Sequence, residues 1–169
     1  MLIYLDANIV QYCADHWDFV SGESAACKTA DAKLQKELEA LRRLVELEQL
    51  GDWTFAAPAH LLAELRGGKG TGEQLDTYKL LEKAWVESVW CDDIQPTEET
   101  VGRIGRSLAT LRLKDADQRH LAEAIALNAS WFLTNDGEVV KKAEGRFAAM
   151  QVCRPSECLE EISVGLFLK

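Results

Sequence analysis

Short apolar runs that alternate with longer amphipathic segments constrain the fold of this chain more than any other feature. The runs LIYL (2–5), WTFAA (53–57), WFLT (131–134) and AMQVC (149–153) are brief and mostly apolar, as are strands that are buried on both faces. Between them lie segments with helical spacing, such as 30–50, where leucines recur every three or four residues. This alternation predicts an α/β fold with a parallel sheet that helices cover on both faces.

The remaining segments extend the same pattern. We expect a further short strand at about 89–91 and helices from about Asn8, over 58–66, 73–87, 97–111 and 114–128, and after Asp136. The Gly-rich stretch 67–72 lacks the flanking strand and the Lys-Ser/Thr pair of a phosphate-binding loop, so we expect a connector there.

Composition excludes several classes of protein. The chain has 169 residues, enough for one domain with a core that needs no disulfide. Its five cysteines are an odd number without a C-x-x-C pair, which argues against a disulfide framework and a zinc cluster. No apolar stretch is long enough for a membrane span, and the start has no basic, signal-like region. We therefore expect a cytoplasmic protein with no membrane partner.

The net charge of −9 disfavours broad electrostatic binding of a polyanion. Any contact with nucleic acid must therefore be local. Carboxylates that converge on one cleft would instead attract a hard cation.

Asp6 follows the first predicted strand directly. In open α/β sheets the ligand crevice lies beyond the carboxyl ends of the strands, which would place Asp6 at its edge. The alternative is structural, because Asp is a preferred N-cap and a helix is expected from about Asn8. This residue alone does not decide between the two.

Asp117 is more informative because a second acid lies beside it. Asp115 and Gln118 have capping-box spacing, so we expect Asp115 to cap the helix and leave Asp117 free of that role. Asp117 shares a helix face with the apolar residues Leu121, Ala124 and Ile125. An acid on such a face needs a cation or hydrogen bonds to offset its burial.

Two further acids have equally ordinary explanations when taken singly. Glu64 lies near the buried stripe of its helix, where a surface pair with His60 is the alternative. Asp136 closes a strand within Asn-Asp-Gly, where a turn or a helix cap would suffice. Taken together, four acids at crevice-facing ends of separate elements predict a Mg²⁺ or Mn²⁺ site. Such an ion lowers the pKa of a bound water and neutralises a phosphate leaving group.

Three segments of the chain resemble the signature segments of PIN domains, most closely those of toxin-like ribonucleases of toxin–antitoxin pairs. They are YLDANIV (4–10), AHLLAELRGG (59–68) and DADQRHLAEAIALNASWFLTND (115–136). The third is the most specific, because an Asp-x-x-His-Leu-Ala-x-Ala run precedes a strand and Thr-Asn-Asp.

The resemblance implies a single Rossmann-like PIN domain over 1–169, with four or five parallel strands and helical elaborations at about 18–50 and 67–88. It also implies a Mg²⁺- or Mn²⁺-dependent endoribonuclease. Asp6 and Asp117 would be the core metal ligands, Glu64 the third acid and Asp136 the fourth. The residues expected to support them or to contact the phosphate are Asn8, Thr134 and Asn135.

RNA is the substrate that the resemblance implies, and an antitoxin protein and a homodimer are the protein partners left open. Basic residues near the crevice are candidates for gripping the RNA backbone, with surface solubilisation as the alternative. They are Arg66, Lys69 and Arg119. Two other functions remain open: a non-catalytic PIN scaffold that binds RNA or a protein, and a metal-dependent phosphatase acting on small phosphate esters.

Overall fold

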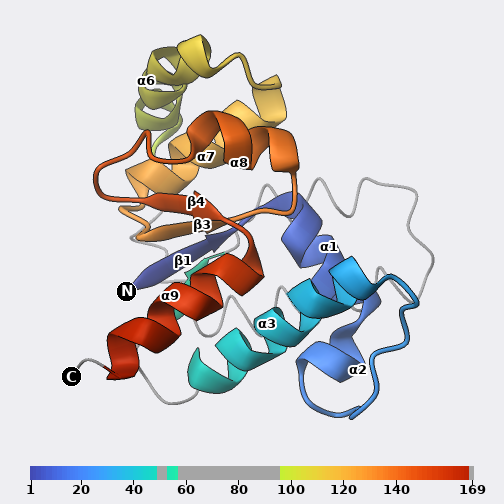
Figure 1. The fold of residues 1–169 in the computed structure, drawn as a ribbon. Helices are drawn as coiled ribbons and strands as arrows, with labels where there is room; N and C mark the ends of the chain where they lie inside the picture. Colours follow the sequence, from blue (N-terminus) through green and yellow to red (C-terminus); the bar gives the residue numbers. More distant parts are fainter. Residues whose placement is uncertain (49–52, 57–95, 168–169) are drawn as a thin grey trace.

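The computed structural model describes residues 1–48, 53–56 and 96–167 (Figure 1). Within them lie four strands: β1 (Leu2–Leu5), β2 (Thr54–Ala56), β3 (Trp131–Leu133) and β4 (Gln151–Cys153). Several predictions fall outside the described residues. They are the helices of 58–66 and 73–87, the strand of 89–91, and the connector of 67–72 with the elaboration at 67–88.

The four strands form one parallel sheet with the order β2-β1-β3-β4. This confirms the predicted α/β class and the parallel sheet of a Rossmann-like fold. The chain passes from β1 to β2 on one side of β1 and later returns to β3 on the other side. The strand order therefore reverses between β1 and β3, and a crevice is expected at the carboxyl ends of these two strands.

Helices cover both faces of the sheet (Figure 1). On one face Ile3, Leu5 and Leu133 pack with α1 (Ala7–Asp15), α2 (Trp17–Val20), α3 (Ala32–Glu48) and α9 (Pro155–Phe167). On the other face Tyr4 and Phe132 pack with α6 (Glu98–Leu108), α7 (Asp115–Ala126) and α8 (Gly137–Ala143). Successive residues of a strand point to opposite faces, so the uniformly apolar strands supply both cores.

The predicted helices of the described residues are present with small shifts at their ends. The helix expected over 97–111 ends at Leu108 and continues as a 3₁₀ turn, η2 (Ala109–Leu111). The short helix α2 and the long helix α9 were not predicted. No helix in the described ranges is long and apolar enough to cross a bilayer.

The predicted cap of α7 is wrong. Lys114 is the N-cap residue and makes no side-chain capping bond, whereas Asp115 is the first residue of the helix. The capping box fails because Gln118 does not reach back to the helix start. Its Nε2 instead donates to the backbone oxygen of Gly105 at 2.8 Å, which ties α7 to α6. Asp115 remains favourable in the first turn through the helix dipole.

Candidate functional site

Asp6 lies at the carboxyl end of β1 and is only 3% exposed. Its backbone N–H donates to the oxygen of Leu133 at 3.0 Å, so β1 and β3 stay paired up to the point where the carboxylate emerges. Asp6 is also the N-cap of α1, and its Oδ1 accepts from the N–H of Ala7 at 2.8 Å. Asp6 is therefore both the N-cap of α1, as the structural alternative proposed, and a residue at the carboxyl edge of the sheet.

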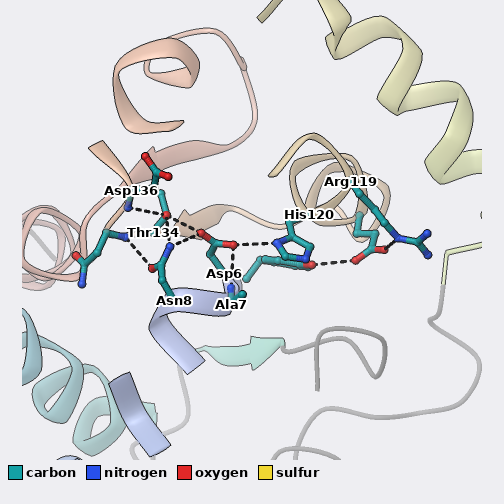
Figure 2. A network of polar contacts seen from close by, with 10 residues as sticks. Asp6, Ala7, Asn8, Arg119, His120, Thr134 and Asp136 are labelled. Carbon is teal, nitrogen blue, oxygen red and sulfur yellow. Dashed lines mark hydrogen bonds and ion pairs between the residues drawn. The ribbon is translucent and has the colours of Figure 1, made fainter. Parts of the chain in front are cut away.

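Three further donors converge on the Asp6 carboxylate (Figure 2). Oδ1 lies 2.9 Å from Nδ1 of the buried His120. Oδ2 accepts from Nδ2 of Asn8 at 2.6 Å and from the hydroxyl of Thr134 at 2.7 Å. With Asp6 ionised, the contact with His120 requires the imidazole proton on Nδ1. Four donors from three parts of the chain thus hold one carboxylate in a single orientation.

Thr134 connects the ends of β1 and β3. It is fully buried, and while its hydroxyl donates to Asp6 the same oxygen lies 3.0 Å from Nδ2 of Asn8 and 3.0 Å from the N–H of Asp136. The N–H of Asn135 in turn donates to Oδ1 of Asn8 at 2.9 Å. The structure therefore brings Asn8, Thr134 and Asn135 together around Asp6.

Asp136 follows this network and begins the next helix. It is the N-cap of α8, and its Oδ1 accepts from the N–H groups of Glu138 and Val139 at 2.8 and 3.4 Å. The structural alternative for Asp136, a helix cap, is therefore present. A cap uses one carboxylate oxygen and leaves the negative charge of the group in place.

Asp117 lies in the first turn of α7 and is half-buried. Its pKa is raised, first by burial and then by the negative charges of Asp6 and Asp136, while Lys114 and His120 act in the opposite direction. Like charges raise the pKa of a carboxyl only when they lie close enough to interact. Two acids from separate elements thus act on Asp117 at the point where the strand order reverses.

The acids at this edge of the sheet supply carboxylate oxygens, which are the ligands that a hard divalent cation prefers. The residues that the structure describes contain no group of three or more His, Cys, Asp or Glu side chains placed to hold a metal. Glu64, the third predicted acid, lies outside the described residues. All four Asp6 contacts are hydrogen bonds, so a cation at Asp6 would take the place of one donor.

Arg119, predicted as a candidate to grip RNA, is held elsewhere. Its Nη2 lies 2.6 Å from Glu98 and its Nε 3.0 Å from Glu123, which is buried. The hydroxyl of Tyr4 donates to the same Glu123 at 2.9 Å. Arg119 therefore neutralises a buried carboxylate within the fold. The other two candidates, Arg66 and Lys69, lie outside the described residues.

Sequence reasoning missed two residues near this edge. His120 contacts Asp6, and Arg154 follows the last strand directly. The rule applied to Asp6, that residues just after a parallel strand face the crevice, also selects Arg154. A scan against family models, a search of curated proteins and a search of solved structures each found no match to this chain.

Proposed function

We propose that this protein is a Mg²⁺- or Mn²⁺-dependent endonuclease that hydrolyses RNA phosphodiester bonds. One observation carries the proposal: Asp117 lies close enough to Asp6 and Asp136, at the carboxyl edge of β1 and β3, for their charges to add to burial in raising its pKa. Fixed negative charges at a crevice lower the free energy of a bound cation. The choice of RNA rests on the resemblance of the three sequence segments to PIN domains.

The residues around Asp6 have separate roles in this proposal. His120 and Thr134 hold the carboxylate in one orientation, and one of the four donors to Asp6 would give way when a cation binds. Asn8 bridges the ends of both strands and keeps Asn135 and Thr134 in register. Asp117 and Asp136 supply the remaining charge, and Glu64 keeps its predicted role as a further acid. A divalent cation held by these acids would generate a nucleophilic hydroxide and stabilise the leaving oxygen.

The test compares cleavage of a panel of labelled single-stranded and hairpin RNAs in Mn²⁺, in Mg²⁺ and in EDTA. Asp117→Asn is the main variant, because removing a charge that its neighbours repel should leave the fold at least as stable. Asp115→Asn is the matched control, since it removes an exposed acid from the same helical turn. We expect metal-dependent cutting by the wild type and by Asp115→Asn, and a loss of at least about a hundredfold in Asp117→Asn.

Asp6→Asn adds a second variant. Its amide would present a donor to groups that themselves donate, so its folding must be checked by circular dichroism. Equal cutting by Asp117→Asn and the wild type would overturn the proposal. RNA binding without cutting would instead identify a scaffold, and turnover of small phosphate esters alone would identify a phosphatase.

A further inference from the structure

Arg154 lies at the same edge of the sheet as the carboxylates. It follows Cys153, the last residue of β4, and the backbone N–H of Thr134 donates to the oxygen of Cys153 at 3.1 Å. The backbone of Arg154 is therefore next to the strand end that supplies the hydroxyl bound to Asp6. Parallel strands end at a common edge of the sheet, so Arg154 lies at the edge where the crevice is proposed.

The Arg154 side chain extends toward the start of α8. Its Nη2 lies 3.5 Å from the position that a Cβ on Gly137 would occupy. Gly137 is the first residue of α8 and follows Asp136 directly. Because glycine has no side chain, nothing from this position covers the guanidinium, which lies next to Gly137 and so one residue along the chain from Asp136.

Among the residues that the structure describes, the guanidinium of Arg154 has no acceptor. Its Nε is buried and, within residues 1–48, 53–56 and 96–167, has no hydrogen-bond partner. Arg42, Arg43 and Arg119 each pair with a glutamate, whereas no such pair involves Arg154 in these ranges. Buried donors are nearly always satisfied, so an unsatisfied one calls for an explanation such as a ligand that arrives from outside.

The acidic net charge of the chain makes the lack of a carboxylate partner at Arg154 more informative. The acidic residues exceed the basic ones, 28 to 19, so carboxylates to neutralise an arginine are abundant in this chain. An arginine held without one, near acids that would repel a polyanion, supplies local positive charge where a phosphate would need it. The planar fork of N–H groups in arginine matches two phosphate oxygens, which a lysine ammonium does not.

We propose that Arg154 binds a backbone phosphate of single-stranded RNA at this edge of the sheet, beside Asp136. The proposal rests on the proposed function for its ligand and deepens it by naming the residue that holds the substrate. Arg154 thereby replaces Arg119 as the cation that meets the RNA backbone.

The experiment measures binding of a fluorescein-labelled single-stranded RNA by anisotropy, in EDTA and over a series of salt concentrations. Each phosphate contact in single strands contributes about −0.7 to the slope of log K against log salt. For Arg154→Gln we expect affinity at least about fivefold lower and a slope smaller in magnitude by about that amount. Arg154→Lys should keep the slope and recover only part of the affinity, because it keeps the charge and loses the fork.

Arg103→Gln is the matched control, since it removes an exposed arginine from α6 and should leave the slope unchanged. Thermal unfolding confirms that each variant is folded, and Arg154→Lys carries the test if Arg154→Gln does not fold. An unchanged slope in Arg154→Gln, an equal loss in Arg103→Gln, a reduced slope in a folded Arg154→Lys, or no RNA binding by the wild type overturns the inference.

Cleavage separates this inference from the proposed function. If Arg154→Gln cuts RNA with an unchanged KM, the inference fails and the nuclease stands. If the wild type cuts no RNA in Mn²⁺ but binding still depends on Arg154, the inference stands and the nuclease fails.

Discussion

Two buried carboxylates in this protein invite comparison, Asp6 at the edge of the sheet and Glu37 on α3. They are 3% and 4% exposed, and each accepts hydrogen bonds from a helix N-terminus. Among the described residues Glu37 binds Ser156 alone, accepting from its N–H at 2.9 Å and from its hydroxyl at 3.0 Å. These bonds attach the first turn of α9 to α3, so Glu37 has a clear structural role.

Asp6 differs in how many elements meet around it. Its donors come from α1, from α7 and from the residue after β3, and its charge adds to burial in raising the pKa of Asp117. Burial alone therefore does not indicate that an acid is functional, since Asp6 and Glu37 are both buried. Contact with several elements and interaction with further acids distinguish Asp6 from Glu37, and each prediction below tests that distinction.

The largest expected effect on stability is that of Glu37→Ala. It removes two hydrogen bonds to a charged acceptor and leaves the buried Ser156 N–H and hydroxyl unsatisfied, at a cost of about 3 kcal/mol. Urea unfolding measures this loss, with the exposed Glu39→Ala as control, for which we expect a change within about 0.5 kcal/mol. Cleavage per folded molecule should stay within about twofold of the wild type, because the variant lacks only a structural acid. A loss of cutting in folded Glu37→Ala would contradict the purely structural role of Glu37 and remove the difference from Asp6.

Thr134→Val should lower stability and cleavage together. The hydroxyl joins Asp6, Asn8 and the N–H of Asp136, so its removal costs about 2 kcal/mol in thermal or urea unfolding. We expect metal-dependent cleavage to fall by roughly 10- to 100-fold as Asp6 loses a fixed donor. Thr134→Ser keeps the hydroxyl and should retain most of both. Stability loss with full cleavage would place Thr134 with Glu37 as a structural residue.

Asp136 allows its capping role to be separated from its charge. Asp136→Ala should cost about 1 kcal/mol because α8 loses its cap, whereas Asp136→Asn keeps a capping oxygen and should be close to the wild type in stability. Both variants remove the charge, and we expect both to lose metal-dependent cleavage to a similar degree. Full cleavage by Asp136→Asn would show that this residue is only a cap and would narrow the site to Asp6 and Asp117.

The smallest expected stability change is that of Asp117→Asn, which should stabilise the protein rather than destabilise it. Because the pKa of Asp117 is raised in the fold, its ionisation destabilises the folded state. Wild-type stability should therefore decrease as pH rises from the ordinary carboxyl range through the raised pKa, and Asp117→Asn should lack this component. We expect the variant to be more stable at neutral pH by less than about 1 kcal/mol, because Asp117 is only half-buried.

Thermal unfolding over a pH series measures this difference. Added Mn²⁺ should raise the melting temperature of the wild type and not that of Asp117→Asn, since a ligand stabilises only the state that binds it. An identical pH dependence in the two proteins would show that the acids do not interact and that Asp6 resembles Glu37 after all.

Much of this fold follows from local pattern. The four described strands and most helices were predicted because each buried face imposes its own spacing on the apolar residues. The helix α9 was missed, although Pro155 at its first position and the buried Cys158 and Ile162 at spacing four carry the helical signal. Its attachment to Glu37 could not be predicted, because that contact joins residues far apart in the chain.

Some residues at this edge were named from the sequence, whereas His120 and Arg154 were missed and the contacts could not be predicted. Strand ends pointed to Asp6 and Asp136, since parallel strands finish at one edge, and the resemblance to PIN domains pointed to Thr134. The failure at Asp115 shows the limit, because the capping-box spacing is local and the partner that Gln118 found, Gly105, lies on another helix. The contact of His120 with Asp6 depends on how α7 is rotated against the sheet, which no spacing reveals.

The pairing of β1 with β3 also determines when this site can exist during synthesis. Asp6 and Thr134 are 128 residues apart, so the first strand leaves the ribosome long before its central partner. At typical translation speeds the apolar strand β1 waits on the order of 10 seconds before β3 is available to pair with it, which favours capture of the nascent chain by chaperones. The same delay keeps Asp6 and Asp136 apart until translation is well advanced, so the acids of the candidate site cannot meet on a growing chain before then.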